Sequence, residues 1–110
     1  MTHPQLPAPI TAYYAAKNRH DIDAMLLPFA EDAHVHDEGE DHVGYAAIRA
    51  WMDRTTRKYR VTVEPLEAGE RDGWLEVIAR VSGDFPGSPA NLRYRFQLDG
   101  DRITALTIGS

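Results

Sequence analysis

Ala33-His34-Val35-His36-Asp37 alternates apolar and polar residues and ends in a carboxylate. An alternation with a period of two predicts a short β-strand over this stretch. Because successive side chains of a strand point to opposite faces, we expect Val35 and Asp37 to face the core. The same parity sends His34 and His36 outward. The strand therefore presents a carboxylate at its inner end.

The residues before this strand have the spacing of two helices. After prolines at positions 7 and 9, one segment has helical spacing and good helix formers, with a face made of Ile10, Tyr13, Tyr14 and Lys17. Asp21 is a predicted N-cap, and the second helix that follows has an apolar stripe of Ile22, Met25, Leu26 and Phe29. Pro28 is expected to end or bend this helix, because proline removes a backbone donor.

The residues after the strand contain a third helix and then a change of period. Residues 37–43 are predicted to form a charged loop, and Gly44 precedes a helix from Tyr45 to about Lys58. Four strands with a period of two follow, separated by turns at residues 69–73, 83–89 and 99–101. Helices followed by a run of hairpins are typical of an α+β domain with helices on one face of a curved antiparallel sheet. Such an arrangement leaves a cavity between the layers.

The composition fits one globular domain over residues 1–110. The chain has 110 residues, 43% of them hydrophobic, and no cysteine, which excludes disulfides and thiol chemistry. Twelve basic and seventeen acidic residues give a net charge of −5, which argues against general nucleic-acid binding. Neither a signal peptide nor a membrane-spanning segment is evident, so we expect a cytoplasmic protein that does not bind membranes.

Several of these motifs together resemble the nuclear transport factor 2-like superfamily, in its SnoaL-like and ketosteroid-isomerase-like branch. The matching segments are residues 13–18, 21–24, 29–37 and 44–51. The resemblance implies an α+β, cone-shaped fold with three N-terminal helices packed on a strongly curved antiparallel sheet. It says less about function, since the superfamily includes isomerases, hydrolases, cyclases, dehydratases and non-catalytic modules.

The resemblance also implies roles for two residues and a departure at a third. Tyr13 matches the tyrosine that ketosteroid isomerases use as an oxyanion donor, and Asp37 matches their general base. Leu92 stands where that family has a protonated aspartate on a late strand, so the second donor is missing. Losing one oxyanion donor costs about 10²–10³ in rate, which argues against steroid isomerisation itself and leaves related proton transfers open.

An apolar pocket around Asp37 is the candidate site. Apolar neighbours raise the pKa of a carboxyl group toward neutrality, as a general base requires. The candidate lining residues are mostly aromatic, and core packing is the alternative for each: Tyr14, Phe29, Val35, Trp51, Phe85, Tyr94 and Phe96. His36 and Asp84 are candidate polar contacts of the pocket.

A metal site is an alternative for the histidine-rich segment. His34, His36, Asp37 and His42 are residue types that bind metals. Strand parity, however, places the first two histidines and Asp37 on opposite faces, so a regular strand cannot direct all three at one ion. We therefore expect no metal and no cofactor.

The resulting hypothesis is cofactor-free proton transfer on a small hydrophobic organic ligand, of an isomerase, cyclase or dehydratase kind. Asp37 would be the base and Tyr13 would polarise a carbonyl. One alternative is a non-catalytic ligand-binding or dimerisation module of the same fold, with Asp37 solvent-exposed or salt-bridged and no rise in its pKa. Another is epoxide-hydrolase-like water activation, which requires Asp84 to approach Asp37. A homodimer through the outer face of the sheet is also expected.

Overall fold

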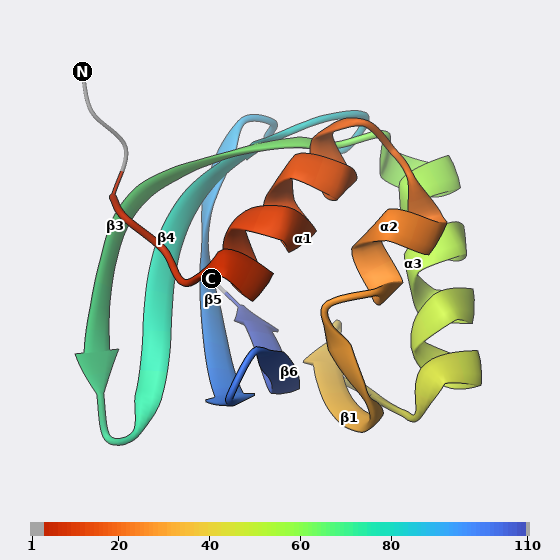
Figure 1. The fold of residues 1–110 in the computed structure, drawn as a ribbon. Helices are drawn as coiled ribbons and strands as arrows, with labels where there is room; N and C mark the ends of the chain where they lie inside the picture. The colour runs from red at the N-terminus through yellow and green to blue at the C-terminus, as the bar shows by residue number, and fades with distance from the viewer. Residues whose placement is uncertain (1–3, 110) are drawn as a thin grey trace.

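A computed structural model describes residues 4–109 as three helices and six strands (Figure 1). The elements in chain order are α1 (Ala8–Asn18), α2 (Ile22–Leu26), β1 (Phe29–Asp37), β2 (Glu40–Val43), α3 (Tyr45–Tyr59), β3 (Thr62–Arg71), β4 (Trp74–Ser82), β5 (Ala90–Asp99) and β6 (Arg102–Gly109). The α+β class expected from the sequence is confirmed. Over the same residues, none of the helices combines the length and apolarity needed to cross a bilayer.

The strands form one open, mixed sheet in the order β2-β1-β6-β5-β4-β3. Most neighbours are antiparallel, as expected for successive hairpins. The exception is β1, which runs parallel to β6 and pairs Val35 with Leu106. This pairing inserts an early strand beside the last one, so the helical half of the chain and the hairpin half share a single sheet.

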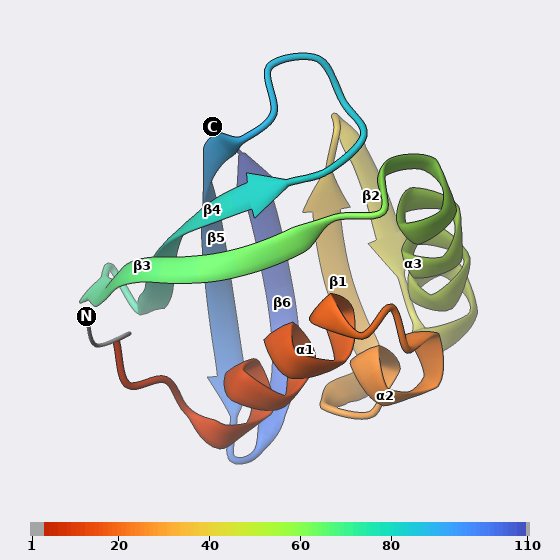
Figure 2. The same ribbon diagram turned by 90° about the horizontal axis from the view of Figure 1, so that it is seen from above.

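The helices lie on the concave side of the bent sheet (Figure 2). Helix α1 contacts β3 and β6, whereas α3 contacts β1 and β2. The face of α1 predicted to be buried does enter the core, because Ile10 and Tyr13 are fully buried. Ile48, Trp51 and Met52 of α3 are buried as well, at the spacing of one helical face. The core therefore fills the inside of the curve.

The second helix is shorter than its apolar stripe suggests. Helix α2 ends at Leu26, and Phe29 begins β1. Pro28 has no backbone N–H to continue the helix, and its carbonyl accepts a hydrogen bond from the Ile103 amide at 2.8 Å. Phe29 is fully buried, but it reaches the core from a strand, which corrects its assignment to the helix.

The charged segment after Asp37 is a β-hairpin and not a loop. Glu40–Val43 forms β2, which pairs antiparallel with β1. The two residues of the turn, Glu38 and Gly39, both have positive φ, at 54° and 76°, as a tight two-residue hairpin requires. The acidic residues of β2 have low strand propensity, so the sequence pattern did not indicate this strand.

A close contact at Gly83 holds the loop between β4 and β5 against the end of α3. A Cβ atom at this position would lie 2.5 Å from the Tyr59 carbonyl oxygen and 2.9 Å from Val61 Cγ1. The amide of Asp84 donates a hydrogen bond to the same Tyr59 oxygen at 2.7 Å. Only glycine allows this approach, which brings Phe85 beside the ring of Tyr59 at a centroid distance of 6.3 Å.

This contact predicts that Gly83→Ala destabilises the fold by about 2 kcal/mol, because the added methyl group overpacks a backbone contact. Gly69→Ala is the matched control, since no neighbouring atom of residues 4–109 would lie within 4 Å of the methyl group that it adds. The control is expected to be neutral or up to about 1 kcal/mol stabilising. Urea unfolding of both variants measures the difference, and equal effects would contradict the packing argument.

Candidate functional site

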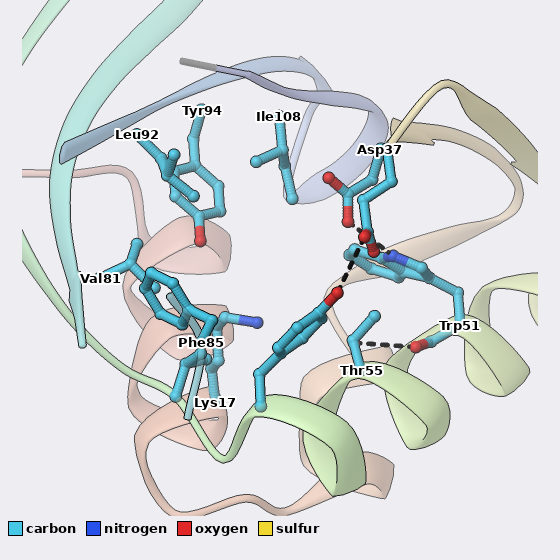
Figure 3. Close-up of a pocket in the computed structure, with 12 residues that line it drawn as sticks. Lys17, Asp37, Trp51, Thr55, Val81, Phe85, Leu92, Tyr94 and Ile108 are labelled. Atoms are coloured by element: carbon cyan, nitrogen blue, oxygen red, sulfur yellow. Dashed lines mark hydrogen bonds between the residues drawn. The ribbon is translucent and has the colours of Figure 1, made fainter. Parts of the chain in front are cut away.

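A cavity of about 270 Å³ lies between α1, α3 and the concave face of the sheet (Figure 3). Its size suits a small molecule. The lining is largely apolar and comes from every layer of the fold: Lys17, Asp37, Glu38, Trp51, Thr55, Tyr59, Val61, Val81, Phe85, Leu92, Tyr94 and Ile108.

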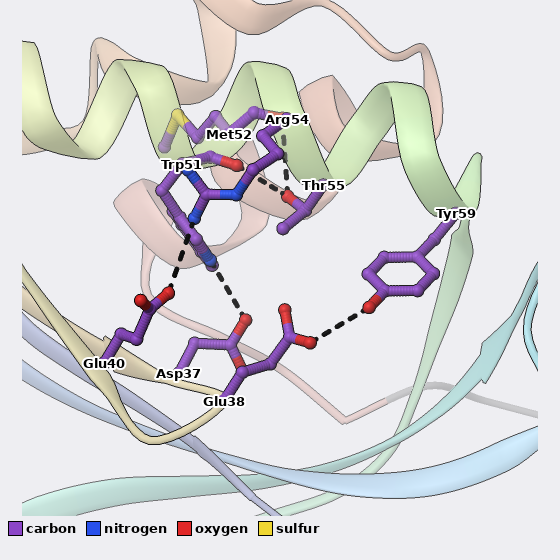
Figure 4. A network of polar contacts seen from close by, with 8 residues as sticks. All are labelled: Asp37, Glu38, Glu40, Trp51, Met52, Arg54, Thr55 and Tyr59. Atoms are coloured by element: carbon purple, nitrogen blue, oxygen red, sulfur yellow. Dashed lines mark hydrogen bonds and ion pairs between the residues drawn. The ribbon is translucent and has the colours of Figure 1, made fainter.

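Asp37 enters this cavity from the end of β1. Strand parity holds as predicted, because Val35 is fully buried while the His34 and His36 side chains are 53% and 43% exposed. The Trp51 indole Nε1 of α3 donates a hydrogen bond to Asp37 Oδ2 at 3.0 Å (Figure 4). This bond fixes the orientation of the carboxylate against the apolar wall.

The surroundings make Asp37 a stronger base than an ordinary aspartate. Burial raises the pKa of its carboxyl group, and the neighbouring charge of Glu38 adds to the increase. The Trp51 hydrogen bond and the Lys17 ammonium oppose the rise in the pKa, but burial is the largest of these effects. Because its pKa is raised, the ionised Asp37 carboxylate binds a proton more tightly than an ordinary aspartate does.

Glu38 supplies a second carboxylate to the same cavity. It lies in the β1–β2 turn, and its Oε2 accepts a hydrogen bond from the Tyr59 hydroxyl at 2.9 Å (Figure 4). Tyr59 is the last residue of α3. Asp37 and Glu38 thus both accept a hydrogen bond from a side chain of α3.

Lys17 and Tyr94 face these carboxylates from the other side of the cavity. In Figure 3 the Lys17 amine and the Tyr94 hydroxyl point into the cavity opposite Asp37 and Trp51. Burial lowers the pKa of Lys17 to about 8, although the charge of Asp37 opposes this change. Burial raises the pKa of Tyr94, so its hydroxyl keeps its proton at neutral pH.

Tyr13 lies behind the cavity, in the core. It is fully buried, its hydroxyl has no hydrogen-bond partner among residues 4–109, and it is not one of the lining residues. Its ring packs edge-on against Phe29 at a centroid distance of 5.5 Å. Burial raises the pKa of the Tyr13 phenol, with Tyr94 and Asp37 adding to the increase.

Of the residues predicted to form the pocket, Asp37, Trp51, Phe85 and Tyr94 line it. The other aromatic and aliphatic candidates are buried in the core without lining the cavity: Tyr14, Phe29, Val35 and Phe96. Asp84 is exposed in the loop between β4 and β5 and does not line the cavity. Core packing therefore describes about half of the apolar candidates.

The predicted histidine cluster divides between two faces of the sheet. His34 Nε2 and His36 Nδ1 both lie on the outer face and bond to Asp41 Oδ1, at 2.9 Å and 2.8 Å. His36 therefore does not contact the pocket. His42 packs its ring on Trp51 at a centroid distance of 5.9 Å. No group of three or more potential metal ligands is found within the described part of the chain.

Four polar lining residues were not identified as site residues from the sequence: Lys17, Glu38, Thr55 and Tyr59. The spacing of Lys17 and Tyr59 along their helices gave a signal for these two. Lys17 continues the buried face of Ile10 and Tyr13 by one more turn, and Tyr59 lies two turns after Trp51 on α3. A charged or polar residue that extends an apolar helical stripe indicates a polar group directed at the interior.

The Trp51 hydrogen bond predicts a measurable pKa change. Trp51→Phe removes the donor to Asp37, and because this bond lowers the pKa of Asp37, the pKa is expected to rise further. Carbon-13 NMR titration of the Asp37 carboxyl measures it. Tyr59→Phe, which removes the bond to Glu38, is expected to shift the pKa of Asp37 much less. A pKa that stays constant or falls in Trp51→Phe would contradict the assigned role.

The same shift predicts how stability depends on pH. The pKa of Asp37 is higher in the folded chain than in the unfolded one, so its contribution to stability is present below the ordinary value of about 4. That contribution is lost as the pH rises through the folded pKa. Compared with wild type, Trp51→Phe should lose it at a higher pH, which chemical unfolding across the acidic range can detect.

Comparison with known proteins agrees with this fold. The solved structure of a polyketide cyclase candidate from Sinorhizobium meliloti superposes with a TM-score of 0.88, is 40% identical, and covers 94% of each chain. A protein with a ketosteroid isomerase-like fold from Catenulispora acidiphila, solved with trimethylamine, gives a TM-score of 0.82 at 23% identity, covering 96% of this chain and 87% of that one.

The epoxide hydrolase/cyclase-like enzyme SalBIII has a TM-score of 0.78 at 20% identity, with 92% of this chain and 86% of that chain covered. No curated protein matches the sequence significantly. A family model described as a SnoaL-like domain matches residues 10–106. The chain therefore belongs to the SnoaL-like domain family.

Proposed function

We propose that this protein catalyses a cofactor-free proton transfer, with Asp37 as the general base, on a small and largely apolar organic molecule. The reaction class is abstraction of a proton from a carbon next to a carbonyl group, as in isomerisation or cyclisation. The observation that carries the proposal is the Asp37 carboxylate, held by Trp51 at the wall of an apolar cavity.

The geometry of Asp37 suits a base. Its Oδ2 accepts the Trp51 hydrogen bond, and a carboxylate has further lone pairs that can receive the substrate proton. Burial raises the pKa of the carboxyl group, bringing it closer to the values at which general bases are effective.

The group that polarises the substrate carbonyl must donate to its oxygen. Among the lining residues, the Tyr94 hydroxyl and the Lys17 amine lie opposite Asp37 and have protons to donate. Leu92 also lines the cavity, so β5 presents an apolar side chain at the position where the ketosteroid isomerases that the chain resembles carry a carboxylic acid. Tyr13 as the polariser stays a prediction, which requires its buried hydroxyl to reach the cavity.

The similarity to the Sinorhizobium protein supports a cyclase among the possible reactions, because the two chains are 40% identical over almost their full lengths. Ring closure by an aldol-type step begins with loss of a proton next to a carbonyl group. Asp37 would supply that step, and the substrate's own second carbonyl would be the electrophile.

The two alternatives receive less support. A non-catalytic binding module would leave Asp37 solvent-exposed or salt-bridged without a rise in its pKa, whereas burial here raises the pKa. Epoxide hydrolysis with Asp84 as partner requires that residue in the cavity, and Asp84 is exposed outside the lining. The homodimer stays a prediction for the outer face of the sheet.

Hydrogen–deuterium exchange at the α-carbon of a cyclic ketone tests the base directly. The probe is 2-tetralone in deuterated buffer, followed by proton NMR. Wild type is expected to accelerate the exchange, with a rate that rises with pH through the raised pKa of Asp37. Asp37→Asn is expected to lose about 10²–10⁴ of the enzyme-dependent rate.

Asp41→Asn is the matched control, because Asp41 is a carboxylate of the same hairpin that bonds His34 and His36 on the outer face. It should exchange the probe like wild type. Equal rates for wild type and Asp37→Asn would remove Asp37 from the role of base.

A further inference from the structure

Lys17 is a buried amine in the wall of the cavity. It lies in the last turn of α1, and only 7% of its surface is exposed. Its neighbours on the same helical face, Ile10 and Tyr13, are fully buried core residues. Figure 3 shows its amine directed into the cavity and not out along the helix. The fold therefore brings a potential cation inside the apolar layer.

This amine has neither a hydrogen bond nor an ion pair among residues 4–109. Its Nζ contacts the ring of Tyr13, 5.7 Å from the ring centroid. Both carboxylates of the cavity are bound to other donors, since Asp37 accepts from Trp51 and Glu38 accepts from Tyr59. The titratable groups that face the amine from the surrounding elements are Tyr13, Asp37, Glu38, Tyr59 and Tyr94.

Burial disfavours the charged form of this amine, as the lowered pKa of Lys17 indicates. Removing an ammonium group from water without a partner is strongly unfavourable. Four lining residues, Val61, Val81, Leu92 and Ile108, have no polar side-chain atoms and offer the amine no acceptor. An anionic oxygen placed in the cavity would give the ammonium the short, charge-assisted hydrogen bond that these residues do not provide.

We propose that Lys17 is the oxyanion-binding residue of the cavity and that its ligands are small, mainly apolar molecules carrying a carboxylate or enolate oxygen. Its part in catalysis rests on the proposed function of Asp37, whereas the binding claim stands independently. The residue was not indicated by the family resemblance, which placed the oxyanion donors at Tyr13 and on the strand that carries Leu92.

Lys17 would act in the proton transfer without changing its own bonds. The C–H bond breaks, its proton goes to the Asp37 carboxylate, and its electron pair forms the new carbon–carbon double bond. The π pair of the carbonyl moves onto oxygen, where Lys17 Nζ donates to it. Return of the proton from Asp37 to carbon restores the carbonyl, so charge and electrons balance without an oxidant or reductant.

Binding of 1-naphthoate compared with 1-naphthamide tests the ligand class. The two probes share shape and ring system but differ in charge. Isothermal titration calorimetry on wild type is expected to show about 10- to 100-fold tighter binding of the carboxylate. Lys17→Met keeps an unbranched apolar side chain and should bind both probes equally. A preference for naphthoate that survives in Lys17→Met would overturn the proposal.

The pH dependence of wild type supplies a second readout that needs no variant. The free amine has a pKa of about 8, and a bound anion favours its protonated form. Naphthoate binding near pH 8 should therefore take up about half a proton per ligand, measured by calorimetry in buffers of different ionisation enthalpy. Affinity should fall as the pH rises above this value. Binding without proton uptake and without this fall would contradict the assignment.

Asp37→Asn separates this inference from the proposed function. If the proton goes to Lys17, the uptake persists in Asp37→Asn and is lost in Lys17→Met. An uptake that disappears in Asp37→Asn would assign the proton to Asp37 and overturn the claim for Lys17. Loss of ketone exchange in Asp37→Asn, together with unchanged naphthoate binding in Lys17→Met, would keep the base and reject the oxyanion site.

Discussion

The parallel pairing of β1 with β6 is the constraint on which the site depends. It joins the helical half of the chain to the antiparallel hairpins and sets Val35 opposite Leu106 and His36 opposite Thr107. This register turns Val35 into the core and carries Asp37 to the edge of the cavity. Ile108 of β6 lines the same cavity. A shift by one residue would exchange the two faces of β1 and put the histidines inside.

The cavity combines apolar walls with carboxylates and an amine, an arrangement that folding alone does not favour. Burial raises the pKa of Asp37 and lowers the pKa of Lys17 to about 8. Both shifts show that the folded chain disfavours the charged forms. Buried ionisable residues with shifted pKa values are typical of functional sites, where the ligand or the reaction supplies the interactions that the folded chain lacks. The SnoaL-like scaffold thus provides the shape, and these two residues provide the chemistry that we propose.

Much of the fold could be predicted from periodicity, whereas the site could be predicted only in part. The strand parity of Val35 and Asp37 and the buried face of α3 followed directly from spacing. The β1–β2 hairpin did not, because its acidic residues resemble a loop, and the parallel partner of β1 is a long-range choice that no local pattern encodes. The spacing of Lys17 after Ile10 and Tyr13 predicts that it shares their face of the helix. That its amine points into a cavity depends on how α1 crosses the sheet, which the spacing does not determine.

Asp37 and Lys17 are proposed to act on one ligand in one cavity. A crystal structure of the complex with 1-naphthoate tests this most directly. We predict the rings against the apolar wall, with a carboxylate oxygen about 3 Å from Lys17 Nζ and the ring system between Lys17 and Asp37. Naphthoate bound outside the cavity, or inside it with its carboxylate directed away from Lys17, would contradict a shared site.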